Sequence, residues 1–426
     1  MGSDPQYAKW PLLPLSQNVF TLTNPYASRP SQEAAVKKLQ DAIEEHKMAP
    51  LYKYLAHPLE GILNVVGEGG ASAPGKPLSR KSSAVGMIAT KSPTATVTIP
   101  WDEGLYQKLK EANDRELEEY QKEEDEAVEK AGDTEIMAAK GKRAEFWARE
   151  KSIAAYEDVF EKTGILGTKI DLVLAIIRMG LFYGDKLLVK KEVERAKTLV
   201  ESGGDWDRRN RLKAYEGLYL LTVRSYNLAA PLLLDSLSTF TSYELCTYSN
   251  LVVYSVLAGS VSLKRVDFKS KVPEAEMAVD FSPLAQLVSS LYSGRYKTFF
   301  QALANVEEQF LTQDRYLHEH KNWFIREMRL RAYQQLLQSY RVVGLESMAS
   351  QFGVTVDFLD RDLAKFIAGG RIPCTIDRVS GKGVIETNRP DDKNKQYQDV
   401  VRQGDQLITK LQKYGQAVRL RGSERA

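Results

Sequence analysis

The sequence predicts a mostly α-helical protein: a tetratricopeptide-like, right-handed solenoid of helical repeats, then a winged helix, then one long C-terminal helix. Three observations support this fold class. Between residues 140 and 340, apolar residues recur at spacings of three and four, with almost no strand pattern. Residues 345–388 read as helix, turn, helix and hairpin. Residues 391–426 then carry an apolar heptad pattern.

Length and composition limit the possible functions. A chain of 426 residues is too long for one compact core. Its net charge of +3 creates no general attraction for nucleic acid or an anionic membrane. Two cysteines allow neither a disulfide framework nor a four-cysteine zinc site. We find no signal peptide and no apolar run of the roughly 18 residues that a membrane helix needs, so we expect a soluble intracellular protein without membrane partners.

The N-terminal part divides into a helical segment, residues 1–55, and a low-complexity insertion, residues 56–100. Helical periodicity in residues 31–55 is broken at Pro50. Gly, Ala, Pro, Ser and Thr fill 22 of the 32 positions from 67 to 98, which predicts a flexible segment. Residues 105–130 form a charged helix that we expect to be solvated.

Residues 101–225 are predicted to form the tetratricopeptide-like repeats, and residues 226–390 a second domain that ends in a winged helix at 340–390. Gly217, Leu220, Ala229 and Leu233 have the spacing of one repeat, in which the glycine allows two helices to touch. The expected breaks between helices are Gly164, Gly167, Gly184, Gly203, Gly204 and Gly294.

The winged helix is predicted from two apolar stripes and an alternating strand pattern. Gly353 should end its first helix, and Thr355 should cap its second. The apolar positions are Leu345, Met348, Ala349 and Phe352 on the first helix, Val356, Leu359, Leu363 and Phe366 on the second, and Ile372, Cys374 and Ile376 on the strand. Residues 384–387 form the returning strand, and residues 391–426 the C-terminal bundling helix.

No motif for catalysis, a metal or a cofactor is complete. The stretch "GASAPGKP" has Pro77 where a phosphate-binding loop needs a hydroxyl. The pair His318 and His320 lacks a downstream aspartate at the spacing of a zinc isopeptidase, so we expect both histidines on a solvated helix face or turn. Cys246 and Cys374 are expected to be small core residues. We therefore predict a protein that is not an enzyme and binds no cofactor.

The winged helix is predicted to bind protein and not nucleic acid. Residues 345–389 carry six bases and six acids, and the second helix has three aspartates against two bases. Two surfaces remain for partners, a sheet edge and a helix stripe. The predicted sheet residues are Thr375, Asp377, Val384, Ile385 and Glu386. The predicted C-terminal helix residues are Tyr397, Val400, Leu407, Leu411, Tyr414 and Val418.

Seven stretches carry a family resemblance. They are "MAPLYKYL" (48–55), "ESGGDWDRRNRLKAYEGLYLL" (201–221), "DSLSTFTSYEL" (235–245), "FIREMRLRAYQQLLQSYR" (324–341), "SMASQFGV" (347–354), "IETNRPDDKNKQYQ" (385–398) and "LQKYGQAVRL" (411–420). With them the chain resembles the PCI-domain scaffold subunits of the 26S proteasome regulatory particle lid. The insertion at 56–98 is longer than expected for that family.

The resemblance implies a non-catalytic scaffold that supports ubiquitin-dependent protein degradation in the cytoplasm and nucleus. Its partners would be other PCI-domain lid subunits and the lid's metalloprotease deubiquitinase. Arg208, Arg209 and Arg211 would then form ion pairs between helices or subunits, or remain ordinary solvated charges, and Trp206 would be a packing residue. The alternatives are a PCI subunit of the signalosome, a nucleic-acid-binding winged-helix protein and, last, an enzyme.

Overall fold

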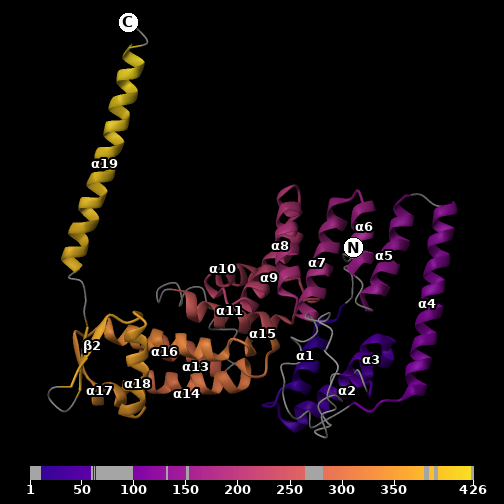
Figure 1. Cartoon of the computed structure of the whole chain (residues 1–426), viewed down its shortest axis with the longest axis horizontal. Coiled ribbons are helices and arrows are strands. Elements are labelled where there is room, and N and C mark those ends of the chain that lie inside the picture. Colours follow the sequence, from indigo (N-terminus) through magenta and orange to yellow (C-terminus); the bar gives the residue numbers. More distant parts are fainter. Residues whose placement is uncertain are drawn as a thin grey trace, which may run out of the picture. The chain divides into compact units, whose positions relative to one another are not determined.

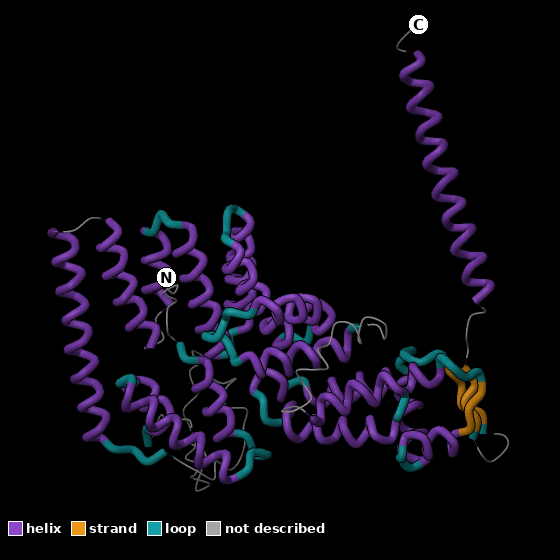
Figure 2. Tube along the Cα trace, turned by 180° about the vertical axis from the view of Figure 1, so that it is seen from behind, coloured by secondary structure: helices purple, strands orange, loops and turns teal. Residues whose placement is uncertain are grey.

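The computed structural model describes residues 11–58, 61, 63, 99–130, 133–149, 153–263, 282–378, 383–387 and 392–423. Helices dominate these residues, and three short strands form one sheet (Figures 1 and 2). The predicted mostly α fold class is confirmed. The predicted flexible segment at 67–98 lies outside the described residues. None of the described helices is long and apolar enough to span a membrane.

The chain divides into two compact units. The first contains residues 1–292 and 301–327, and the second contains residues 293–300 and 328–426.

The first unit begins with three helices whose starts are set by local sequence. The Ser28 hydroxyl caps α2 by accepting a hydrogen bond from the backbone N–H of Ser31. Pro50 lies in the first turn of α3, where a missing N–H costs nothing, so it begins a helix instead of breaking one. The bounds are α1 (Leu13–Thr23), α2 (Arg29–Glu45) and α3 (Ala49–Ala56).

Three further helices, α4 (Glu103–Lys130), α5 (Asp133–Arg149) and α6 (Ile153–Lys162), precede the repeats. The acidic helix α4 forms ion pairs with α5: Glu123 lies 2.9 Å from Lys142, and Glu124 bonds to Arg143. Tyr120 also meets Phe146 edge to face, with ring centroids 6.0 Å apart. The charged helix is therefore solvated on one side and paired on another.

The repeats are helix pairs that touch at glycines. A Cβ on Gly217 of α9 would lie 2.6 Å from Leu233 of α10, and one on Gly180 of α7 would lie 2.6 Å from Val189 of α8. The predicted close crossing at Gly217 is confirmed. The predicted break at Gly167 is wrong, because this residue lies in the first turn of α7. The bounds are α7 (Leu166–Tyr183), α8 (Lys186–Glu201), α9 (Trp206–Thr222), α10 (Tyr226–Ser236), η2 (Leu237–Thr239) and α11 (Tyr248–Ser262).

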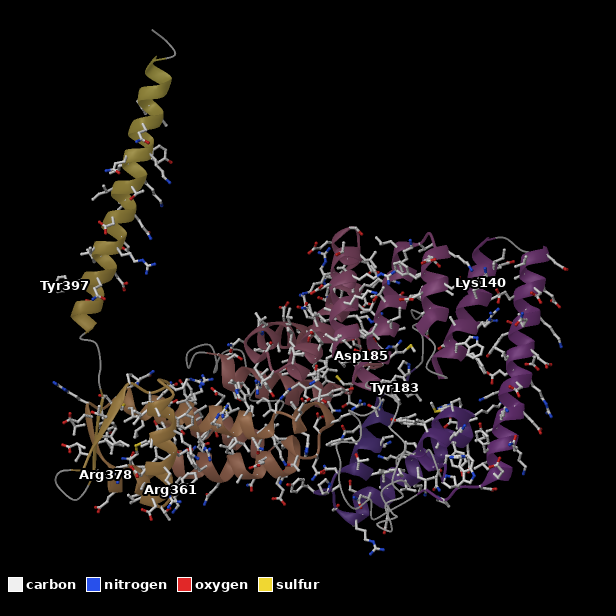
Figure 3. All side chains as sticks on the ribbon, viewed as in Figure 1. Lys140, Tyr183, Asp185, Arg361, Arg378 and Tyr397 are labelled. Carbon is white, nitrogen blue, oxygen red and sulfur yellow. The ribbon has the colours of Figure 1, made fainter. Side chains whose placement is uncertain are left out.

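Capping residues connect these helices. Gly184 ends α7 in the left-handed conformation, and the side chain of Asp185, labelled in Figure 3, accepts from two backbone N–H groups of α8. The predicted domain boundary at 225/226 falls in the turn between α9 and α10, two helices that pack together. The chain continues through α13 (Ser282–Ser293), α14 (Tyr296–Val306), the π-helical turn η3 (Glu307–Leu311), α15 (Arg315–His318) and α16 (Lys321–Leu337).

The second unit contains the winged helix. Gly353 ends α17 with φ of 68°, and the Thr355 hydroxyl caps α18. Phe352 packs edge to face on Tyr333, with centroids 5.0 Å apart. Val356 was expected to be buried but is 39% exposed, because only the later turns of α18 face the core. The bounds are β1 (Val342–Gly344), α17 (Leu345–Phe352), α18 (Val356–Ala368), β2 (Cys374–Asp377), β3 (Val384–Thr387) and α19 (Asp392–Ser423).

Candidate protein-interaction site

The sheet of the winged helix has three strands in the order β1-β3-β2, and both pairings are antiparallel. Ile385 of β3 pairs with Val343 on one side and with Ile376 on the other. The returning strand is thus the middle strand and has no open edge. This corrects the expectation for Val384, Ile385 and Glu386, which cannot pair with a partner's strand through their backbones.

The outer edges of the sheet belong to β1 and β2. Thr375 and Asp377 lie on β2 with exposed side chains, so the predicted edge surface reduces to these two residues. The sequence pattern did not predict β1, although Val342 on it is largely exposed. Three residues are too few to show a strand period, and β1 is recognisable only through its pairing with β3.

Eight of the exposed large apolar side chains in the described part of the chain lie on the C-terminal helix α19. Its six predicted stripe residues are each between 61% and 71% exposed. Val401 and Ile408, which the heptad pattern omits, are exposed beside them and widen the stripe. Figure 3 shows Tyr397 projecting from the N-terminal part of this helix. Apolar side chains in such a row normally contact another helix.

The charges of α18 differ from those assumed from the sequence. Asp362 is buried, accepts a hydrogen bond from the Tyr333 hydroxyl at 3.1 Å, and lies 3.3 Å from Arg329 Nη2. Asp360 forms an ion pair with Arg378, the residue that follows β2. Arg378 is labelled in Figure 3. Two of the three aspartates therefore hold the domain together and do not face a ligand.

A network of ion pairs lies among the repeat helices. Arg208 of α9 donates two hydrogen bonds to Asp171 of α7, at 3.0 and 2.6 Å. These bonds raise the pKa of the Arg208 guanidinium. Arg211, which is 1% exposed, donates to Asp171 and to Glu244, at 3.3 and 2.6 Å. The inter-helix ion pairs expected for Arg208 and Arg211 are confirmed.

The neighbours of these arginines behave differently. Arg209 is exposed, as an ordinary solvated charge is. Trp206 is 65% exposed at the start of α9, so its interpretation as a packing residue is wrong. The first residue of a helix projects beyond the packed turns, which explains why a large aromatic ring remains in solvent there.

Comparison with known proteins decides the family. Residues 102–271 match the family described as 26S proteasome subunit RPN7, residues 296–387 match the PCI domain, and residues 396–418 match the RPN7/PSMD6 C-terminal helix. The chain is 40% identical over 422 residues to the 26S proteasome regulatory subunit rpn7 of Schizosaccharomyces pombe, covering 96% of this chain and 97% of that protein. It is 38% identical over 435 residues to RPN7 of Saccharomyces cerevisiae, covering 99% and 96%.

The chain belongs to the RPN7 family of 26S proteasome regulatory subunits. The match to the RPN7/PSMD6 C-terminal helix spans residues 396–418, which include all six predicted stripe residues of α19. Similarity to COP9 signalosome complex subunit 1 of Arabidopsis thaliana is lower, at 26% identity over 244 residues, covering 56% of this chain and 54% of that protein. The signalosome alternative is therefore the more distant relationship.

In this member of the RPN7 family, both histidines singled out from the sequence lie against backbone carbonyl groups. His318 Nδ1 lies 3.1 Å from the Thr312 carbonyl oxygen, and His320 Nε2 lies 2.8 Å from that of Thr222. The expectation of two solvated histidines is wrong for His320, which is buried. Both cysteines are buried and neither forms a disulfide, as expected for small core residues. No group of three or more metal-ligating side chains occurs in the described part of the chain.

Proposed function

We propose that this chain is a non-catalytic scaffold subunit of the lid of the 26S proteasome regulatory particle. In this role it supports ubiquitin-dependent protein degradation by holding other subunits together. The observation that carries the proposal is the near full-length similarity to RPN7 subunits, which extends through the C-terminal helix. The proposed partners are other PCI-domain lid subunits, and the lid's metalloprotease deubiquitinase would supply the chemistry. The proposed location is the cytoplasm and the nucleus.

The α19 stripe is the proposed assembly surface. Fully burying a large apolar side chain is worth roughly 1.5–3 kcal/mol. Burying the six stripe residues together with Val401 and Ile408 would therefore strongly stabilise the docking of a partner helix. The glycine within the row, Gly404, has nothing within 4 Å of the position of a Cβ, which leaves room for a close helix crossing. Sheet edges at β1 and β2 provide a second, smaller surface for strand pairing.

The test is purification of a tagged copy of the chain from its source cell, with the co-purifying subunits identified by mass spectrometry. We expect PCI-domain lid subunits of the proteasome. Recovery of signalosome subunits without proteasome subunits would favour the alternative assembly, and recovery of the chain alone would contradict both.

A pair of variants tests α19 in the same experiment. Leu407→Asp with Leu411→Asp places two charges in the stripe and should abolish recovery of the partners. The matched control, Gln406→Asp with Thr409→Asp, places the same two charges on the opposite side of the helix and should leave recovery unchanged. Equal recovery with both variants would remove α19 from the proposal.

A further inference from the structure

The N-terminal helix α1 and its C-cap residue bond to a segment almost 300 residues later in the sequence. Gln17 of α1 uses both ends of its amide: Nε2 donates to the Gln313 carbonyl oxygen at 2.6 Å, and Oε1 accepts from the Arg315 backbone N–H at 3.0 Å. Asn24, which is buried, donates from Nδ2 to the Thr312 carbonyl oxygen at 2.8 Å. We call residues 13–26 the strap and residues 312–323 the junction segment.

Ring contacts extend this attachment. Phe20 of the strap meets the His318 ring edge to face, with centroids 5.2 Å apart. The Lys321 ammonium lies 4.0 Å from the ring centroid of Tyr26, a distance at which a cation is attracted to an aromatic face. The strap therefore contacts the junction segment from Thr312 to Lys321, and not at a single point.

The opposite side of the junction segment is bonded to the repeat helices. Arg315 Nη2 donates to the Phe182 carbonyl oxygen at 2.7 Å, near the end of α7. His320 Nε2 lies 2.8 Å from the Thr222 carbonyl oxygen, at the end of α9. Both oxygens belong to the last turns of their helices, where carbonyl groups lack partners within the helix. The junction segment thus joins the strap to two repeats.

The junction segment has little regular structure with which to hold its own shape. It follows the π-helical turn η3 and contains only the four-residue helix α15 and the start of α16. Its backbone groups at Thr312, Gln313 and Arg315 are bonded to strap side chains, and an unpaired buried backbone group is costly. The strap supplies the side-chain partners of the Gln313 carbonyl and the Arg315 N–H, and it shares the Thr312 carbonyl with His318 of the segment itself.

We infer that the strap is a conformational latch: when it is docked, α15 and the first turn of α16 are fixed, and when it is released, they loosen. Helix α16 begins in the first unit and continues into the second from residue 328 onward. Release of the strap therefore frees the N-terminal anchor of the helix that leads into the winged helix. A partner that binds the strap at Gln17 and Asn24 would therefore loosen the start of α16.

The test is hydrogen exchange of the full chain carrying Gln17→Glu and Asn24→Asp. These nearly isosteric changes remove the two amide donors. Since each lost hydrogen bond changes an opening equilibrium several-fold, we expect backbone exchange in residues 315–323 to rise by about tenfold or more. Exchange within α7 and α9 should stay unchanged. The control is Thr21→Val, which alters a strap hydroxyl that bonds only within α1 at 3.0 Å.

Two results would overturn the latch. Unchanged exchange in residues 315–323 would show that the strap does not hold the segment. A uniform rise across all helices of the first unit would show that the strap is an ordinary part of the core. Should the double variant not fold, Gln17→Met removes both Gln17 hydrogen bonds without adding charge, and the same two outcomes apply to it.

Discussion

Arg211 and Glu244 form an ion pair of 2.6 Å between Nη2 and Oε1, although Arg211 is almost completely removed from solvent. The Tyr215 hydroxyl donates to the same Glu244 oxygen at 2.9 Å. Asp171 lies 3.3 Å from the other terminal nitrogen of Arg211. One guanidinium therefore connects α7, α9 and the segment before α11.

Replacing Arg211 by Ala should destabilise the protein strongly. Removing one partner of a buried pair leaves the other charge without compensation, which costs about 3–5 kcal/mol. Arg209→Ala, at an exposed position on the same helix, should change stability by less than about 0.5 kcal/mol. Urea unfolding followed by circular dichroism provides the comparison. Similar urea midpoints for the two variants would mean that the buried ion pairs of Arg211 stabilise the fold no more than an exposed arginine does.

Gly217→Ala should also destabilise the protein. Its new Cβ would lie 2.6 Å from Leu233 Cδ2 and 2.7 Å from Cγ in a fully buried contact, and overpacking of this kind costs about 1–3 kcal/mol. Gly141 of α5 has nothing within 4 Å of the place that a methyl group would occupy, so Gly141→Ala should raise stability by about 0.5–1 kcal/mol. Opposite shifts in the thermal midpoint are the expected outcome, and a stabilised Gly217→Ala chain would contradict the close crossing.

The free chain with Leu407→Asp and Leu411→Asp should keep its melting temperature. Both side chains are exposed in the structure, so neither charge is placed in a core. Differential scanning fluorimetry of the isolated variant checks this directly. A much lower melting temperature would show instead that α19 packs on its own domain in solution.

Stability should fall as the pH rises above about 9. Burial raises the pKa of the Cys246 thiol from 9.0 to about 12, and those of the Tyr54 and Tyr316 hydroxyls from 10.0 to about 12. The unfolded chain therefore releases these protons first. The deeply buried Cys246 and Tyr316 each lower the free energy of unfolding by about 1.4 kcal/mol per pH unit between their two pKa values, and the partly exposed Tyr54 contributes less because solvent screens it. Their stabilising contribution is complete below pH 9 and is lost progressively toward pH 12.

Unfolding free energies measured from pH 8 to pH 11.5 provide the check on this alkaline effect. In Cys246→Ala the decline should begin near pH 10, because only Tyr54 and Tyr316 remain of the three groups. A flat profile for the unaltered chain between pH 9 and pH 11 would contradict the burial of these groups.

Local pattern was enough to predict most of the helices. Periodicity located both helices of the winged helix, and Gly353 and Thr355 end and cap them as expected. The role of Gly217 also followed from spacing, since only a residue without a side chain fits a close helix crossing. The heptad periodicity likewise predicts the apolar stripe of α19, although Val401 and Ile408 fall outside a strict heptad.

Contacts between distant parts of the chain could not be predicted in this way. The central position of β3 depends on its pairing with Val342–Gly344, a strand too short to show alternation. The helix pattern predicts a surface charge at Asp362, because its partner Tyr333 lies on another helix. The same reasoning predicts a solvated His320, although the structure pairs it with Thr222, 98 residues away. Polar groups that bond across long sequence distances leave no periodic signal.

The hydrogen bond from Asn24 to Thr312 spans 288 residues, which has a consequence for protein synthesis. At about 5–20 residues per second, the ribosome takes roughly 15–60 s to produce the acceptor after the donor has been made. During that interval Gln17 and Asn24 lack the distant segment to which they will later bond, although α2, against which α1 packs, already exists. The amides of the nascent N-terminal helix must therefore remain bonded to water or to provisional partners for tens of seconds before their final partner exists.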